Sequence, residues 1–392
     1  MDCKTIHDVD VRNRRVLVRV DFNVPIADGC VVDDTRIRAA APTLRGLLAR
    51  SAAVILCSHL GRPNGACVPA LSLRPVAAIL EDIMGRGVQF VEDCLGDAAH
   101  ASAERLLPGE MLLLENTRFH AGENRDDAEM ARELAELADV FVNDAFGVVH
   151  RKHASTVGVA QHLPAVAGLL LEKELEYLGR VLNRPRRPFV AILGGAKIPE
   201  KIGVIESLLE RADRVLIGGG MANTFFGAQG IEVAESLVTD AAFETARALL
   251  EQAGDKLVLP TEVVIADSFC ADAELKSIPV TEGVPSGWRI LDIGDATVER
   301  FATHVSTARM ILWNGPMGVF ELPPFAAGTN AVAQLIAKSD ATSIVGGGDS
   351  VAAVRQSGLA GEITHISTGG GASLEFLQGK VLPGVAALDP VH

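Results

Sequence analysis

Aromatic residues are scarce in this sequence: Phe, Trp and Tyr make up 4% of 392 residues, and only one is a tyrosine. So few rings argue against a platform on which the bases of single-stranded nucleic acid stack. Positive charge is also in deficit, because 36 Lys and Arg residues face 50 Asp and Glu residues, for a formal net charge of −14. A surface of this charge repels nucleic acid and anionic lipid. Any anionic ligand therefore needs a local cluster of cations or backbone amides.

Long apolar runs and paired cysteines are missing as well. No run reaches the ~18 residues of a membrane-spanning helix, and the opening Met1-Asp2-Cys3-Lys4 contains no apolar signal region. The cysteines form no CxxC pair and show no zinc-type spacing with histidine; they are Cys3, Cys30, Cys57, Cys67, Cys94 and Cys270. Free thiols are typical of a reducing compartment, so the sequence predicts a soluble cytoplasmic protein.

Two common nucleotide-binding fingerprints are absent. No GxxxxGK[ST] segment occurs, which excludes a P-loop protein. The GxGxxG fingerprint is incomplete, because Asn223 stands where the third glycine after Gly218 and Gly220 belongs. This weakens the alternative of a nicotinamide-dinucleotide dehydrogenase.

What the chain does contain is a series of short strands rich in Val, Ile and Leu. They are apolar at nearly every position, which is typical of strands covered on both faces. The expected strands are 16–20, 53–57, 111–114, 140–142, 190–193, 214–217, 257–259, 290–293, 310–313, 343–345 and 363–366. Helical stretches lie between them, for example 126–139, where apolar residues recur near the 3.6 period. Alternating strands and helices predict doubly wound parallel sheets.

The length of the chain favours two domains. We place the first domain at 1–164, a single long hinge helix at 165–183 and the second domain at 184–371. The fold class is therefore α/β, with two doubly wound, Rossmann-like parallel-sheet domains joined by a helix. The tail 372–392 is too short for another domain and must pack on an existing one or across the hinge.

Glycine clusters follow four strands of the second half. They are Gly194-Gly195, Gly218-Gly219-Gly220, Gly346-Gly347-Gly348 and Gly369-Gly370-Gly371. Glycine turns that lead into helices aim backbone amides at an anion, although a single such cluster can also be a tight turn. Lys197 follows the first cluster and Lys201 lies one helical turn later, so both are candidates for contact with a phosphate. Asp349 and Ser350 follow the third cluster, where the carboxylate suits Mg²⁺, helix capping or both.

In the first half, charged and polar side chains follow the strands instead. Arginine binds phosphate and carboxylate through its planar fork, although each arginine taken alone would be a solvated surface residue. The candidates are Asp21, Asn23, Arg36, His59, Arg62, Arg118 and Arg151. His59 has no nucleophile near it in the sequence, so we favour a hydrogen-bonding or charge role over that of a general base.

Eight stretches, in order from Val16 to the C-terminus, together resemble phosphoglycerate kinase. They are VRVDFNVP (18–25), SHLGRP (58–63), ENTRF (115–119), NDAFG (143–147), LGGAK (193–197), WNGPMGVFE (313–321), GGGDS (346–350) and STGGGA (367–372). The resemblance implies reversible phosphoryl transfer from 1,3-bisphosphoglycerate to ADP, giving 3-phosphoglycerate and ATP, with closure of the two domains. It also implies that the C-terminal tail returns to the first domain.

The resemblance also assigns roles to residues. The seven candidates of the first half would bind the phosphoglycerate. The nucleotide would contact Gly195, Lys197, Lys201, Gly219, Asn314, Pro316, Glu321, Gly346, Gly347, Gly348, Asp349 and Ser350. Asp349 would hold Mg²⁺ and Glu321 the ribose. Arg36, Lys197 and the amides of Gly347 and Gly370 would stabilise the transferring group. We expect a monomer, because a hinge must stay free; the remaining alternative is a non-catalytic nucleotide-binding module.

Overall fold

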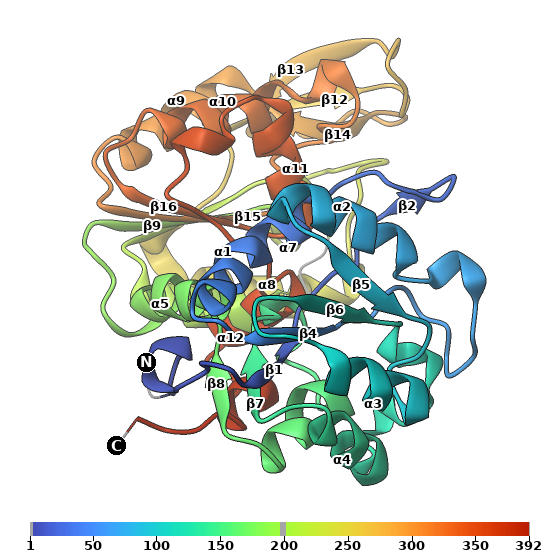
Figure 1. Ribbon diagram of the computed structural model, residues 1–392. Helices are drawn as coiled ribbons and strands as arrows, with labels where there is room; N and C mark the ends of the chain where they lie inside the picture. Colours follow the sequence, from blue (N-terminus) through green and yellow to red (C-terminus); the bar gives the residue numbers. More distant parts are fainter. Residues whose placement is uncertain (1–2, 197–200, 392) are drawn as a thin grey trace. The chain divides into compact units, whose positions relative to one another are not determined.

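The computed structural model describes residues 3–196 and 201–391. Its contacts divide the chain into two compact units (Figure 1). Unit 1 comprises the chain up to Glu176 together with the segment from Val381 onward, and unit 2 runs from Tyr177 to Lys380. In the described part of the chain, no helix is long and apolar enough to cross a membrane.

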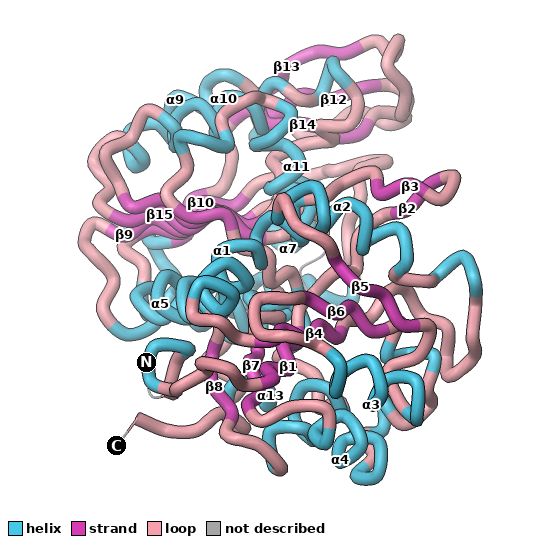
Figure 2. The backbone as a smooth tube through the Cα atoms, viewed as in Figure 1, coloured by secondary structure: helices cyan, strands magenta, loops and turns pink. Residues whose placement is uncertain are grey.

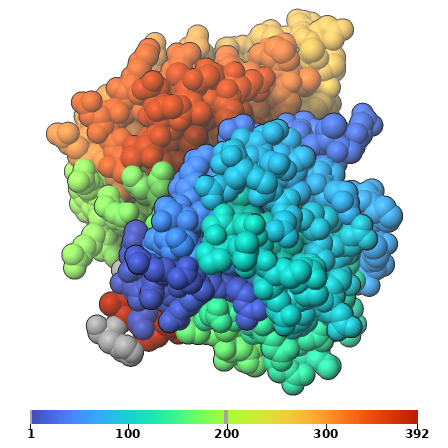
Figure 3. Space-filling model, in the orientation of Figure 1, coloured from blue at the N-terminus to red at the C-terminus, as the bar shows by residue number. Residues whose placement is uncertain are grey.

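Unit 1 is built on a six-stranded parallel sheet in the order β5-β6-β4-β1-β7-β8. The strands are β1 (Arg15–Arg19), β4 (Ala53–Cys57), β5 (Val88–Val91), β6 (Met111–Leu114), β7 (Val140–Asn143) and β8 (Ala165–Ala167). All five residues of β4 are buried, as expected for a strand covered on both faces. A short hairpin of β2 (Ile26–Ala27) and β3 (Cys30–Val31) projects from the unit (Figure 3).

Helices cover both faces of this sheet (Figure 2). They are α1 (Thr35–Ala49), α2 (Arg74–Met84), α3 (Gly96–Arg105), α4 (Ala128–Glu136) and, after the chain returns, α13 (Pro383–Ala386). The helix expected at 126–139 is α4, which begins where Asp127 Oδ1 accepts the amides of Glu129 and Met130 at 3.1 and 3.0 Å. An Asp cap of this kind satisfies two of the free amides in the first turn.

The expected hinge helix at 165–183 is shorter than predicted, because residues 165–167 form strand β8 beside β7. Helix α5 (Leu169–Asn183) follows, and the division between the units falls within it. Asp144 Oδ1 accepts the amides of Leu170 and Leu171 at 2.9 and 3.2 Å, which caps the helix at this point. A Cβ on Gly168 would lie 2.2 Å from the same oxygen, so only glycine fits the turn between β8 and α5.

Unit 2 contains a second six-stranded parallel sheet, in the order β11-β10-β9-β15-β16-β17. Its strands are β9 (Phe189–Leu193), β10 (Arg214–Ile217), β11 (Leu257–Val258), β15 (Met310–Asn314), β16 (Thr342–Gly346) and β17 (His365–Ile366). Its helices are α6 (Ile202–Arg211), α7 (Gly219–Ala228), α8 (Phe243–Ala253), α9 (Asp295–Val305), α10 (Ala327–Ala337), α11 (Gly348–Gln356) and α12 (Gly371–Leu377). The α/β fold class with two mostly parallel sheets is confirmed.

Two details of unit 2 differ from the expectation. The strand expected at 290–293 is β14 (Arg289–Ile293), and it belongs to an antiparallel sheet with β12 (Glu262–Ala266) and β13 (Leu275–Pro279). Only one of the five residues of β13 is buried, so this strand lacks the apolar run by which the others are recognised. The chain also returns to unit 1 from Val381, after α12, rather than at residue 372.

Candidate active site

In unit 1, Asp21, Asn23 and Arg36 form one hydrogen-bonded group. Arg36 Nη1 donates to Asp21 Oδ2 at 2.9 Å and to the carbonyl oxygen of Asn23 at 3.2 Å. Asn23 Oδ1 in turn accepts the amide of Gly61 at 2.9 Å. Asp21 and Asn23 come after β1 and Arg36 lies in the first turn of α1, so the turn after β1 fixes the direction of the guanidinium. The side chain of Arg36 is 35% exposed and can still reach a ligand.

Arg118, which follows β6, lies in a concentration of positive charge. Its Nη1 donates to the carbonyl oxygen of Gly61 at 2.7 Å, while its Nε is buried without a partner among the described residues. Burial, followed by the charges of Arg19 and Arg151, lowers the pKa of Arg118 to about 10. A bound anion would relieve that repulsion, so the surroundings of Arg118 favour phosphate or carboxylate.

His59 follows β4 and carries no charge at neutral pH. Burial, and then the charge of Arg19, holds the pKa of His59 well below its usual range. Arg19 Nη2 lies 3.2 Å from His59 Nδ1, and arginine can only donate, so Nδ1 accepts and Nε2 carries the proton. The separation of 4.0 Å between His59 Nδ1 and Asp21 Oδ1 is therefore not an ion pair. This state of the imidazole agrees with the preference for a hydrogen-bonding role.

Arg62 and Arg151 are more loosely held. Both are exposed, and Arg151 Nε donates to His150 Nε2 at 3.2 Å. Within residues 3–196 and 201–391, no hydrogen bond or ion pair joins Arg62 to the other candidates. We call the five cationic or imidazole candidates of unit 1, His59 with the arginines at 36, 62, 118 and 151, the basic cluster.

A buried polar network that contacts the basic cluster at His59 was not predicted from the sequence. Arg19 Nε donates to Ser155 Oγ at 2.8 Å, and Ser155 Oγ donates to Glu123 Oε1 at 2.6 Å. Arg19 and Glu123 are both fully buried. The signal was available, because Arg19 interrupts an apolar strand and a fully buried arginine requires partners.

In unit 2, a glycine-lined cavity of about 400 Å³ lies at the carboxyl ends of β9, β15 and β16. Its lining is Gly195, Ala196, Lys201, Asn314, Gly315, Pro316, Gly347, Gly348, Asp349, Ser350, Gly370, Gly371 and Leu374. Gly347 has φ +89°, and a Cβ there would lie 3.1 Å from Asn314 Nδ2. Asn314 Nδ2 is buried and lacks a partner among the described residues, so it is available to a ligand. Gly346 ends β16 beside the cavity but does not line it.

We expect the glycine clusters to present free backbone amides, but in two of the clusters the structure shows an amide that is already hydrogen-bonded. The amide of Gly195 donates to the carbonyl oxygen of Pro316 at 3.0 Å, and that of Gly219 donates to the carbonyl oxygen of Met317 at 2.9 Å. These two hydrogen bonds join neighbouring loops. A Cβ on Gly219 would lie 2.7 Å from the amide nitrogen of Gly195, and Gly195 itself has φ +91°, which favours glycine. The amides at the start of α11 remain, since the first turn of a helix has no intrahelical acceptors for them.

Lys201 lines the glycine-lined cavity, with its ammonium on backbone oxygens. Its Nζ donates to the carbonyl oxygens of Gly194 and Asn314 at 2.7 and 3.3 Å. Lys197, the other lysine of the prediction, lies outside the described residues.

A second, apolar cavity of about 670 Å³ shares Gly195, Ala196, Pro316 and Asp349 with the first. Its lining includes Gly219 and Glu321, as well as Leu237, Phe269 and Met317. Asn223 Oδ1 and Arg289 Nε also belong to lining residues, and both atoms are buried without partners in the described part of the chain. An apolar pocket with a few unsatisfied polar atoms is typical of a small-molecule site.

Several of these lining residues were not predicted. Arg289 is the first residue of β14, one position before the strand expected at 290–293, and Phe269 lies in the loop after β12, which was not predicted. Phe269 is 59% exposed, which the structure alone shows, so the sequence offered no signal for this residue. Asp349 is exposed where the two cavities meet, and its carboxylate is a hard oxygen donor of the kind that Mg²⁺ prefers.

Comparison with known proteins agrees with this geometry. The profile of the family described as phosphoglycerate kinase matches residues 6–380. The chain is 57% identical over 397 aligned positions to phosphoglycerate kinase of Chloroflexus aurantiacus, covering 99% of both chains. It is 57% identical over 391 positions to that of Roseiflexus castenholzii, covering 98% of this chain and 99% of the relative.

Solved structures give the same result. Phosphoglycerate kinase from Coxiella burnetii superposes with a TM-score of 0.89 at 40% identity, covering 98% of each chain. The enzyme from Pyrococcus horikoshii OT3 superposes with a TM-score of 0.87 at 35% identity, also covering 98% of each chain. The chain therefore belongs to the phosphoglycerate kinase family, and it is a phosphotransferase that moves a phosphoryl group reversibly between 1,3-bisphosphoglycerate and ADP.

Proposed function

We propose that the basic cluster of unit 1 binds the phosphoglycerate and that the two cavities of unit 2 together bind the magnesium nucleotide. The observation that carries this assignment is the junction of the cavities at Gly195, Pro316 and Asp349. A nucleotide has an apolar base at one end and phosphates at the other. The apolar cavity suits the base, and the helix amides of the glycine-lined cavity suit the phosphates.

Individual residues of unit 2 then take distinct roles. Glu321 lines the apolar cavity and would hold the ribose hydroxyls. Gly219 lines the same cavity without a side chain that would occupy it. Asn314 and the start of α11 face the phosphates. Asp349 would hold Mg²⁺, which when bound neutralises phosphate oxygens.

In unit 1, guanidinium groups would grip the phosphate and carboxylate of a three-carbon acid. Asp21 and Asn23 hold Arg36 in place, and neutral His59 offers the proton on Nε2 to the substrate. Arg62 and Arg151 are exposed and would complete the cluster when an anion binds.

Phosphoryl transfer needs position and charge more than covalent chemistry. Arg36 from unit 1 and Lys197 from unit 2 would flank the transferring group, and the amides of Gly347 and Gly370 would add to them. The attacking group is a carboxylate or a phosphate oxygen that is already ionised. No general base is required, which suits a histidine that stays neutral.

Because the two ligands bind different units, the reaction requires the units to close and exclude water from the acyl phosphate. We propose that α5 and the C-terminal return act as the hinge between a phosphoglycerate domain and a nucleotide domain. We further propose a monomer that works in the cytoplasm without nucleic acid; the six free cysteines support a reducing compartment.

Calorimetric titration tests the division of ligands between units. We expect Asp349→Asn to weaken binding of MgADP and leave binding of 3-phosphoglycerate unchanged, whereas Asp340→Asn, at an exposed carboxylate outside both cavities, changes neither. A coupled assay with ATP and 3-phosphoglycerate provides the activity reading. Loss of 3-phosphoglycerate binding in Asp349→Asn would contradict the assignment, and NADH binding would revive the dehydrogenase alternative.

A further inference from the structure

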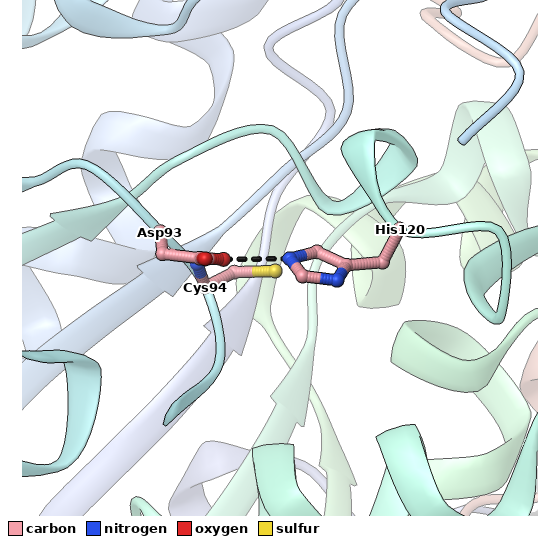
Figure 4. Close-up of side chains that lie close together, drawn as sticks. All are labelled: Asp93, Cys94 and His120. Carbon is pink, nitrogen blue, oxygen red and sulfur yellow. Dashed lines mark hydrogen bonds and ion pairs between the residues drawn. The ribbon is translucent and has the colours of Figure 1, made fainter. Parts of the chain in front are cut away.

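Asp93, Cys94 and His120 form a compact group outside the basic cluster (Figure 4). Asp93 and Cys94 lie in the turn between β5 and α3, and His120 follows the short 3-10 helix after β6. Strands β5 and β6 are parallel neighbours at one edge of the sheet, so their carboxyl ends bring the two turns together. One carboxylate oxygen, the sulfur and one imidazole nitrogen all lie within 4.8 Å of one another.

The arrangement is unsuited to nucleophilic catalysis by the thiol. In a Cys-His-carboxylate triad the two partners bind opposite nitrogens of the imidazole. Here Asp93 Oδ1 lies 2.6 Å from His120 Nε2, and the sulfur points toward the same side of the ring (Figure 4). Cys94 is also fully buried, so a substrate could not reach its sulfur.

Convergence of three different donors on one point is instead the geometry of a metal site. We propose that Asp93, Cys94 and His120 bind a divalent transition ion of the zinc type, through the sulfur, a carboxylate oxygen and Nε2. Thiolate, imidazole and carboxylate are the three ligand types that Zn²⁺ takes from proteins. Tetrahedral bonds of the usual lengths place ligand atoms roughly 3.3–3.8 Å apart, so the present spacing needs only small side-chain movements.

The site is partly preorganised and open to solvent on one side. Asp93 Oδ1 accepts the amides of Cys94 and Leu95 at 2.7 and 3.3 Å, which holds the carboxylate in its turn. The side chains of Asp93 and His120 are 49% and 33% exposed, so an ion and a fourth, water ligand can enter from their side. On binding, the Cys94 proton passes to solvent. Nε2 of His120 gives up the proton that it donates to Asp93 Oδ1, and the neutral imidazole then carries its one proton, exchanged through solvent, on Nδ1.

A bound ion would tie the turn after β5 to the segment after β6. That segment also carries Arg118, two residues before His120, whose Nη1 binds the Gly61 carbonyl. We therefore expect the ion to act as a structural tie beside the basic cluster, separate from the nucleotide magnesium.

Cobalt(II) is the probe of choice, because ligation by thiolate produces a charge-transfer band that oxygen ligands do not. The reference protein is the full chain carrying Cys30→Ser, Cys67→Ser and Cys270→Ser, which removes the three exposed thiols. After treatment with a chelator, we expect one Co²⁺ per chain, a thiolate band and displacement of the band by Zn²⁺.

Single substitutions in this reference protein locate the ion. We expect Cys94→Ser to abolish the band. Loss of an outer-shell partner typically weakens metal binding by ~10–100-fold, so His120→Asn, which removes a direct ligand, should weaken Co²⁺ binding by at least as much. Cys57→Ser is the matched control, because Cys57 is a buried free thiol outside the triad, and it should keep the band. If Cys94→Ser does not fold, His120→Asn and Asp93→Asn decide, since both side chains are partly exposed. The absence of a thiolate band in the reference protein, or a band unchanged in His120→Asn and Asp93→Asn, overturns the proposal.

Discussion

Arg19 Nη2 lies 3.2 Å from His59 Nδ1, which makes a fully buried guanidinium the donor to an uncharged imidazole. The imidazole is thereby fixed in one tautomer, with its Nε2–H directed away from Arg19. This contact therefore couples the buried network to the basic cluster.

Replacing His59 tests that coupling. We expect His59→Leu to lower the free energy of unfolding by about 1–3 kcal/mol, because Arg19 Nη2 loses its acceptor in a buried site. His59→Asn retains an acceptor oxygen for Arg19, so its free energy of unfolding should be close to that of the parent protein. Urea unfolding followed by circular dichroism measures both, and equal stability of the two variants would contradict the role of Nδ1 as an acceptor.

The same histidine predicts sensitivity to acid. Because the pKa of His59 is lowered in the folded state and that of His153 is lowered to about 4, unfolded chains bind protons that the folded chain does not. The stabilisation is complete above pH ~6.5 and falls as the pH drops through the folded-state values. The urea concentration at the midpoint of unfolding should therefore fall less between pH 7 and pH 5 for His59→Asn than for the parent protein.

Arg36→Ala should lower kcat by well over ~100-fold with nucleotide affinity nearly unchanged, as expected for a contact made in the transition state. Arg38→Ala is the matched control two residues away on α1, where Arg38 makes an exposed pair with Asp34 at 2.7 Å. Steady-state kinetics with both substrates measure the two variants. Turnover at the parental rate in Arg36→Ala would rule out the proposed role.

Gly219 tests the nucleotide cavity. Its φ is +62°, and a Cβ would lie 2.7 Å from the amide nitrogen of Gly195, so Gly219→Ala should push the two loops apart and raise KM for ATP. Gly85→Ala is the control, because φ +65° and ψ +29° place Gly85 in the left-handed region and nothing lies within 4 Å of a Cβ there. The control should lose only the ~1–2 kcal/mol of the left-handed backbone, with KM unchanged. A parental KM in Gly219→Ala would show that the wall tolerates the methyl group.

Asp144 predicts the opposite pH dependence. Burial raises its pKa to about 7, from the ~3.9 that is usual for aspartate. The folded chain therefore loses stability as the pH rises through that interval, by about 4 kcal/mol at most. Asp144→Asn preserves the acceptor for Leu170 and Leu171 and removes the charge. Thermal unfolding of this variant should therefore change less between pH 5 and pH 8 than that of the parent. An identical pH slope in both proteins would mean that Asp144 does not titrate there.

The parallel strands were predictable because burial on both faces leaves an apolar run that can be recognised without a structure, as in β4 and β15. Strand β13 was not, since four of its five residues are exposed. The start of α5 was also missed, because 165–167 is compatible with a helix and becomes a strand only by pairing with β7. The roles of individual site residues remain predictions.

The eight motifs, with their chemistry and their order along the chain, are enough to identify the family without a structure. Which groups are available for binding depends on how the chain folds. The fold engages the amides of Gly195 and Gly219 with backbone oxygens and leaves Asn314 Nδ2 without a partner among the described residues. It also places His120 beside Asp93 and Cys94, because neighbouring parallel strands juxtapose residues that are distant in sequence. Protonation and hydrogen bonding depend on neighbours in space, and the linear spacing of residues does not contain them.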